Sequence, residues 1–177
     1  MNDRNYIYLP RTGAEVLKAA PPGTKIYLYS ALCRKRGSPK NILLSLGRHS
    51  IILIQNPKQM NSGHWTSLSI FPETKEAFFF SSYGGKPDVE KNMWIPSREL
   101  QYSGQKRNII NDGLKQLAYE GWTIHYNDYP FQVEGDKTAT CGIWATAFMQ
   151  SGLNPDDFAR HHLDLDDYYR TFFLKKE

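Results

Sequence analysis

Cys141 opens a segment that could turn its thiol into a nucleophile. Residues 141–151 (CGIWATAFMQS) are apolar on all sides and precede Gly152, which predicts a buried helix that begins at Cys141. Because the N-terminus of a helix favours negative charge, it lowers the pKa of a thiol placed there. The polar residues 134–140 predict a loop that leaves the sulfur accessible, and Gly142 would let a substrate carbonyl approach closely. The competing interpretation is a core cysteine, a common fate of free cysteines.

His64 is the candidate general base for this thiol. It stands in Gly63-His64-Trp65, between the polar residues 56–62 and the alternating residues 65–71 (WTSLSIF), which predict a strand. A histidine at the entry to a rigid strand keeps the fixed orientation that a base needs. Taken alone, it is better interpreted as a histidine of a surface turn, so its assignment depends on Cys141.

The other histidines and the second cysteine favour no metal site. The histidines without a context comparable to that of His64 are His49, His125, His161 and His162. The last two are adjacent, whereas a helical metal pair is spaced i, i+4, and no cysteine lies near them. Cys33 and Cys141 lack the clustered spacing of a zinc site and are too few for a disulfide scaffold. We therefore predict no metal.

The order of four short motifs is similar to that of a known group of enzymes. The motifs are Gly63-His64-Trp65, Ser81-Ser82-Tyr83-Gly84, Gln132 and Thr140-Cys141-Gly142. Over roughly residues 50–150 this order resembles the adenain family and the SUMO-protease clan of cysteine peptidases, closest in style to the maturation proteases of adenoviruses and virophages. The resemblance implies a papain-like, adenain-like fold, in which the nucleophile begins a buried helix beside a central mixed β-sheet flanked by helices.

The resemblance also implies a role for each residue. His64 would deprotonate Cys141 and later protonate the leaving amine. Gln132 and the backbone N–H of Cys141 would donate hydrogen bonds to the developing oxyanion. Trp65 would shield the base and wall the substrate channel, which makes Trp65 and Gly142 the predicted substrate-binding residues.

Ser81 stands where the family usually carries an acid. A serine can accept a hydrogen bond from the imidazole, but it carries no charge to steady an imidazolium. Three interpretations are open: Ser81 is a neutral orienter, the enzyme is a Cys-His dyad, or another acceptor such as Asn56 or Ser82 takes the position. We favour the first, because thiolate chemistry depends less on a charged third residue than serine chemistry does. A fourth interpretation is an inactive relative.

The elements expected around these motifs indicate an α+β fold with a central sheet flanked by helices. Strands are predicted at residues 49–55, 65–71, 76–81 and 122–126, with the second and third forming a hairpin. Helices are predicted at residues 14–20, 107–119 and 141–151, with one or two more after Asn154. Residues 25–32 fit either a helix or a strand, residues 34–40 predict a basic loop, and the stretch around Trp94 and Pro96 is irregular.

Length and composition fit one soluble domain over residues 1–177, with 40% hydrophobic and 23% charged residues. No run approaches the roughly 18 apolar residues of a membrane span, and the first residues lack the apolar core of a signal peptide. We expect a monomer that contacts no membrane and is not secreted. The net charge of +4 would suit a nucleic acid partner, but it would equally suit solubility alone.

The sequence therefore favours a cysteine endopeptidase that cleaves after small residues, often glycine, and matures viral capsid or structural proteins in the virion or the host cell interior. The alternative is an isopeptidase that removes ubiquitin or a ubiquitin-like modifier. A further alternative is an inactive relative that binds protein or nucleic acid, using a basic surface that includes Arg34-Lys35-Arg36. We expect no required cofactor, with DNA as a candidate activator, as in adenain. Cys33 does not match the cysteine through which adenain takes a peptide cofactor, so we expect no activator bound by a disulfide.

Overall fold

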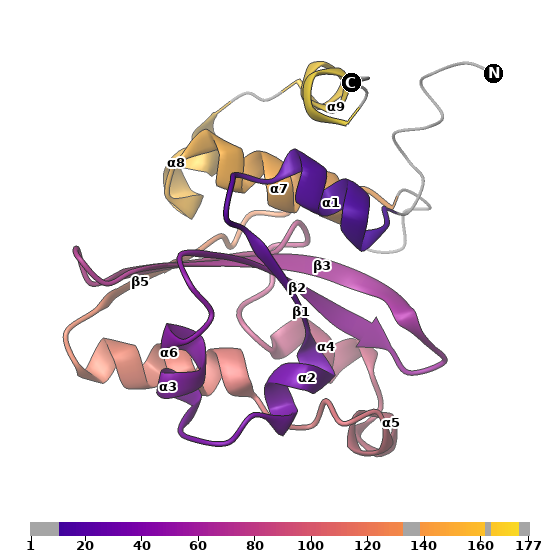
Figure 1. Cartoon of the computed structure of the whole chain (residues 1–177), viewed down its shortest axis with the longest axis vertical. Coiled ribbons are helices and arrows are strands. Elements are labelled where there is room, and N and C mark those ends of the chain that lie inside the picture. Colours follow the sequence, from indigo (N-terminus) through magenta and orange to yellow (C-terminus); the bar gives the residue numbers. More distant parts are fainter. Residues whose placement is uncertain (1–10, 133–138, 162–163, 174–177) are drawn as a thin grey trace.

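The computed structural model describes residues 11–132, 139–161 and 164–173, so most of the loop expected at residues 134–140 lies outside the described residues. Five strands form one mixed sheet in the order β1-β2-β3-β4-β5 (Figure 1). The strands are β1 (Lys25–Leu28), β2 (His49–Asn56), β3 (Gln59–Phe71), β4 (Glu76–Phe80) and β5 (Thr123–Tyr126). The outer pairs are parallel and the β2-β3-β4 pairs are antiparallel. The fold is thus α+β with a mixed sheet, as predicted.

Helices cover both faces of the sheet (Figure 1). On one face lie α2 (Tyr29–Arg34), α3 (Pro39–Leu44), α4 (Val89–Trp94), α5 (Ser97–Tyr102) and α6 (Ile109–Tyr119). On the other lie α1 (Gly13–Ala19), α7 (Cys141–Ser151), α8 (Pro155–Arg160) and α9 (Leu165–Phe172). Because β2 is covered on both sides, its apolar residues alternate between two cores, with Ile52 and Ile54 in one and Ile51 and Leu53 in the other.

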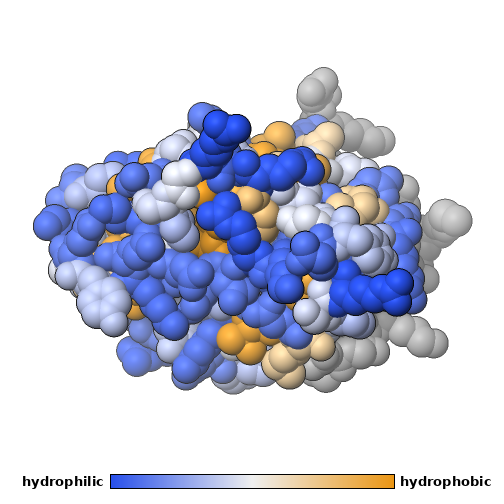
Figure 2. Space-filling view, turned by 90° about the horizontal axis from the view of Figure 1, so that it is seen from below, coloured by the Kyte–Doolittle hydropathy of each residue, from blue (hydrophilic) through white to orange (hydrophobic). Residues whose placement is uncertain are grey.

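The face of the molecule formed by the layer of α2 to α6 is hydrophilic over most of its area, with small scattered apolar areas (Figure 2). This is the pattern of amphipathic helices that bury one stripe against a sheet. Among the described residues, no helix has the length and apolar character needed to cross a bilayer.

Several short helices were missed by the sequence analysis. Helix α3 begins at the end of the segment expected to be a basic loop, where Ser38 caps the helix and Pro39 takes its first position. The stretch expected to be irregular contains α4 and α5, each of six residues. Helices of this length span less than two turns, so their apolar residues show no measurable period. The ambiguous residues 25–32 are divided between β1 and α2.

The unequal lengths of β3 and β4 create the place for a site. Pairing between them covers Ser67 to Phe71 on β3, and β4 ends at Phe80. The half of β3 that contains His64 and Trp65 therefore pairs with β2 but has no strand on its other edge. The chain leaves the sheet after Phe80, and α7 packs on β3 from the opposite layer.

Helix α7 begins and ends where the sequence predicts. Cys141 is its first residue and Gly152, at φ 66°, ends it in the left-handed conformation that glycine adopts readily. Eight of its residues are buried, so the helix is held by packing rather than by one apolar stripe.

Candidate active site

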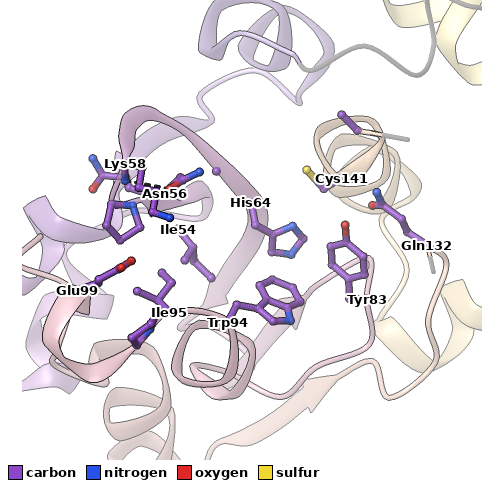
Figure 3. A pocket seen from close by; sticks show the side chains of 15 residues that line it. Ile54, Asn56, Lys58, His64, Tyr83, Trp94, Ile95, Glu99, Gln132 and Cys141 are labelled. Atoms are coloured by element: carbon purple, nitrogen blue, oxygen red, sulfur yellow. Dashed lines mark hydrogen bonds between the residues drawn. The ribbon is translucent and has the colours of Figure 1, made fainter. Parts of the chain in front are cut away.

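His64 lies on β3 beside the end of β4. The residue is 7% exposed, and its ring lies 4.9 Å from that of Tyr83 and 5.4 Å from that of Trp94, centre to centre. Nε2 lies 2.9 Å from Oγ of Ser81, so the structure brings this predicted pair together. Nδ1 is buried and has no hydrogen-bond partner of normal geometry among the described residues, and the thiol of Cys141 interacts with the ring from α7 (Figure 3).

Cys141 is a buried thiol at a helix N-terminus. Burial raises the pKa of Cys141, but the hydrogen bond and the charge of His64 lower it, and the net shift is downward. The backbone N–H groups of Trp65 and Gly142 lower it further by hydrogen bonding to the sulfur. The Trp65 N–H faces the sulfur because β4 ends before it could pair with this part of β3.

The pKa of His64 is displaced in the opposite direction. Burial alone would lower it, but hydrogen bonds and negative charges at Cys141 and Glu90 raise it to about 9. A lowered thiol pKa beside a raised imidazole pKa favours a thiolate and an imidazolium at neutral pH. Such a pair can supply a nucleophile and, later, a proton.

Glu90 is the site residue that the sequence analysis missed. It lies in the first turn of α4, is 7% exposed, and accepts hydrogen bonds from Ser81 Oγ at 2.8 Å to Oε1 and 2.7 Å to Oε2. Oε2 also lies 3.4 Å from Nε2 of His64. The sequence signal that could have found it is an acid shortly after a serine that stands where an acid is expected.

Gln132 reaches the site from the segment after β5. Its side chain is buried and lines the same cavity as His64 and Cys141 (Figure 3). Ser82 makes two hydrogen bonds to it: the carbonyl of Ser82 accepts the backbone N–H of Gln132 at 2.9 Å, and its hydroxyl donates to Oε1 of Gln132 at 3.0 Å. The same carbonyl accepts the backbone N–H of Phe131 at 2.7 Å. With its carbonyl oxygen engaged in this way, the amide of Gln132 is oriented by Ser82.

Trp65 and Gly142, assigned from the sequence to substrate binding, lie beside Cys141 with their packing contacts in the core. The indole of Trp65 is buried in the core with Val16, and its Nε1 donates to the carbonyl of Arg11 at 3.2 Å. A Cβ on Gly142 would lie 3.1 Å from both Trp65 Cδ1 and Val16 Cγ2, so its missing side chain permits close packing of α7. Neither residue lines the cavity; both contribute backbone N–H groups to the thiol.

The alternative acceptors do not contact His64 in the described residues. Asn56 is the last residue of β2, where its side chain accepts the backbone N–H of Lys58. The Ser82 hydroxyl is directed to Gln132.

Cys33 is half-buried, and burial raises its pKa to about 11. Within the described ranges, no group of three or more His, Cys, Asp or Glu side chains is arranged to hold a metal ion.

A cavity of about 780 Å³ extends from Cys141 and Gln132 past His64 (Figure 3). Tyr83 and Trp94 border it near His64, and its far part lies between the turn after β2 and α5. Its lining residues are Ile54, Gln55, Asn56, Pro57, Lys58, Gly63, His64, Tyr83, Trp94, Ile95, Pro96, Glu99, Gln132, Ala139 and Cys141. The Cys141 thiol and the His64 imidazole thus border a space large enough for part of a peptide.

Two viral proteins are similar to this chain. An uncharacterized protein of the Sputnik virophage, V9, is 27% identical over 127 residues, which cover 71% of this chain and 70% of that protein. The protease of bovine adenovirus 2 is 24% identical over 102 residues, which cover 56% of this chain but 43% of the protease. No family model matches the chain. The chain is therefore similar to viral proteins, one of which is a protease.

Proposed function

We propose that the protein is a cysteine peptidase with an adenain-like, papain-like active site, in which Cys141 is the nucleophile and His64 the general base. The observation that carries this proposal is that the buried Cys141 thiol, at the start of a buried helix, meets the buried His64 imidazole at one cavity. Each group displaces the pKa of the other in the direction that favours an ion pair. Structural cysteines in apolar surroundings have raised pKa values, as Cys33 has. The similarity to an adenovirus protease supports the same activity.

In the proposed reaction each of these groups has a defined role. The Cys141 thiolate attacks the carbonyl carbon of the scissile peptide bond, and the oxyanion accepts hydrogen bonds from the Cys141 N–H and the Gln132 amide. The imidazolium of His64 protonates the leaving amine as the C–N bond breaks, which leaves a thioester on Cys141. His64 then takes a proton from water, which attacks the thioester and releases the carboxylic acid and the thiol.

The substrate is a protein with a small residue, often glycine, before the scissile bond. Tyr83 and Trp94 border the cavity next to His64 and favour a substrate with little side chain at that point. Together with the viral relatives, this favours capsid or other structural proteins of a virus as substrates, processed in the virion or the host cell interior.

Peptide cleavage by matched cysteine variants tests this proposal. Wild type and Cys33→Ala should cleave peptides with glycine before the scissile bond faster than peptides with leucine there, and Cys141→Ala should cleave neither. A ubiquitin-like vinyl sulfone probe run in parallel distinguishes an isopeptidase, which would be labelled at Cys141. Equal activity of Cys141→Ala and wild type would refute a cysteine mechanism.

A further inference from the structure

We propose that Glu90 supplies the negative charge that Ser81 lacks, and that it acts on His64 through the Ser81 hydroxyl as a positioning residue. This inference rests on the proposed function, because it assigns a role in the same His64–Cys141 pair. Its components are Ser81, the residue that follows β4, and Glu90 on α4, nine positions apart in the chain.

The hydrogen bonds form a relay that runs from His64 through the Ser81 hydroxyl to Glu90, and they define its direction. A carboxylate only accepts, so the single hydroxyl proton of Ser81 is donated to Glu90, whose two oxygens lie 2.8 and 2.7 Å away. The Ser81 oxygen then accepts from Nε2–H of His64 at 2.9 Å. This fixes the proton of a neutral imidazole on Nε2 and leaves the lone pair of Nδ1 for the thiol proton of Cys141.

The burial of Glu90 has an electrostatic reason. A carboxylate removed from water needs hydrogen bonds and an opposite charge. Ser81 and the backbone N–H of Gly85, 2.8 Å from Oε1, supply hydrogen bonds. Among the described residues, the cationic group within 4.0 Å of its oxygens is His64 when protonated. The carboxylate and the imidazolium therefore stabilise each other.

The surroundings are built to hold Glu90 in this place. A Cβ on Gly85 would lie 2.2 Å from Oε1, so only glycine leaves space for the carboxylate. Asp88, which precedes α4, accepts hydrogen bonds from the Tyr29 hydroxyl at 2.5 Å and the Asn111 backbone at 2.8 Å. These contacts fasten the start of α4 to α2 and α6, and with it the side chain of Glu90.

Among the described residues, Glu90 is one of three titratable groups that face His64. The others are the Cys141 thiol from α7 and the phenol of Tyr83, from the turn after β4. Lys58 and Glu99 are charged residues of the same cavity, on the turn after β2 and on α5. A test of Glu90 therefore needs an uncharged isostere that leaves Cys141 and Tyr83 in place, and Glu90→Gln provides it.

The first experiment measures alkylation of Cys141 by iodoacetamide against pH, which needs no substrate. Removing the charge in Glu90→Gln should lower the thiolate fraction and slow alkylation near neutral pH by about 10- to 100-fold, by analogy with the loss found when the hydrogen-bond partner of a metal-binding histidine is removed. The matched control Glu120→Gln, an exposed carboxylate paired with Lys40, should leave the rate unchanged. Alkylation of Cys33 in the same samples reports whether the fold is intact.

A relocated acid provides the rescue. In Ser81→Asp/Glu90→Gln the carboxylate stands at position 81, beside Nε2, and should restore most of the lost rate. Persistent slow alkylation of a folded double variant, or a wild-type rate in Glu90→Gln, would overturn the role of Glu90. Slow alkylation of Cys141 in the wild type would instead overturn the proposed function, so the two failures are distinguishable.

A measurement on the wild type covers the case in which Glu90→Gln does not fold. ¹⁵N NMR of the neutral His64 ring should show the proton on Nε2 and none on Nδ1. A proton on Nδ1 would contradict the relay, since Nε2 could then not donate to Ser81.

Discussion

The hydroxyl of Ser82 and the side-chain carbonyl of Gln132 lie 3.0 Å apart, and this hydrogen bond fixes the orientation of the amide. The adjacent Ser81 makes the corresponding contact with His64. Two consecutive, fully buried serines thus each hold one of the proposed catalytic side chains.

Replacing Ser82 tests the oxyanion role of Gln132. Ser82→Ala should lower kcat by about tenfold with little change in KM, because the amide loses its fixed orientation, whereas Gln132→Ala should cost about 10² to 10³ in kcat. The double variant should be no slower than Gln132→Ala, since the serine acts only through the amide. Alkylation of Cys141 forms no oxyanion and should be unaffected in all three; additive losses in the double variant would contradict this arrangement.

The pH dependence of kcat/KM follows from the displaced pKa values. Activity should fall on the alkaline side near the His64 pKa of about 9, where the imidazolium that protonates the leaving amine is lost. On the acid side it should fall at a pH below the ordinary thiol pKa of 9.0, where the thiolate is protonated. A profile that rises through pH 9 would contradict the ion pair.

The same shift has a consequence for stability. The folded-state pKa of His64 lies above its unfolded value of 6.5, so its stabilising contribution is complete below pH 6.5 and is lost as the pH rises through about 9. His64→Gln should remove this dependence. Urea unfolding of both proteins between pH 6 and pH 10 measures it, and parallel curves would show that His64 contributes nothing to it.

Gly85 should tolerate no side chain. In Gly85→Ala the new Cβ would displace the Glu90 carboxylate, so alkylation of Cys141 near neutral pH should slow as in Glu90→Gln. Gly113→Ala is the control, because its Cβ would lie 2.5 Å from Leu43 Cδ1 in the core beneath α6. Overpacking in that control should lower the free energy of unfolding by typically about 1–3 kcal/mol, and so lower Tm, without slowing alkylation. A wild-type alkylation rate in Gly85→Ala together with slowed alkylation in Gly113→Ala would show that Gly85 does not hold the Glu90 carboxylate in place.

Variants of Trp65 and Trp94 distinguish a role in packing from a role in substrate binding. Its indole lies in the core, so Trp65→Phe should lower Tm while KM and the alkylation profile stay near wild type, because the backbone N–H that faces Cys141 remains. Trp94→Phe, in the cavity wall beside His64, should instead raise KM. A large rise in KM for Trp65→Phe would instead indicate that Trp65 contacts the substrate.

The sequence predicted those features that depend on local pattern. The apolar residues from Cys141 to the terminating Gly152 define α7, and the alternation in residues 65–71 defines the buried half of β3. The same alternation puts the side chains of His64 and Trp65 on opposite faces of β3, because successive side chains of a strand point to opposite faces.

The position of Glu90 depends on contacts that no local pattern reports. Helix α4 is too short for a period, and its placement depends on Asp88 binding Tyr29 and Asn111, residues distant in the chain. The same is true of the free edge of β3, which exists because β4 ends at Phe80.

The most direct test of the central claim compares the two cysteines of one molecule. Iodoacetamide near neutral pH should modify Cys141 far faster than Cys33, whose raised pKa of about 11 keeps it protonated, and His64→Ala should abolish the difference. Equal slow modification of both cysteines in the wild type would contradict the ion pair of Cys141 and His64.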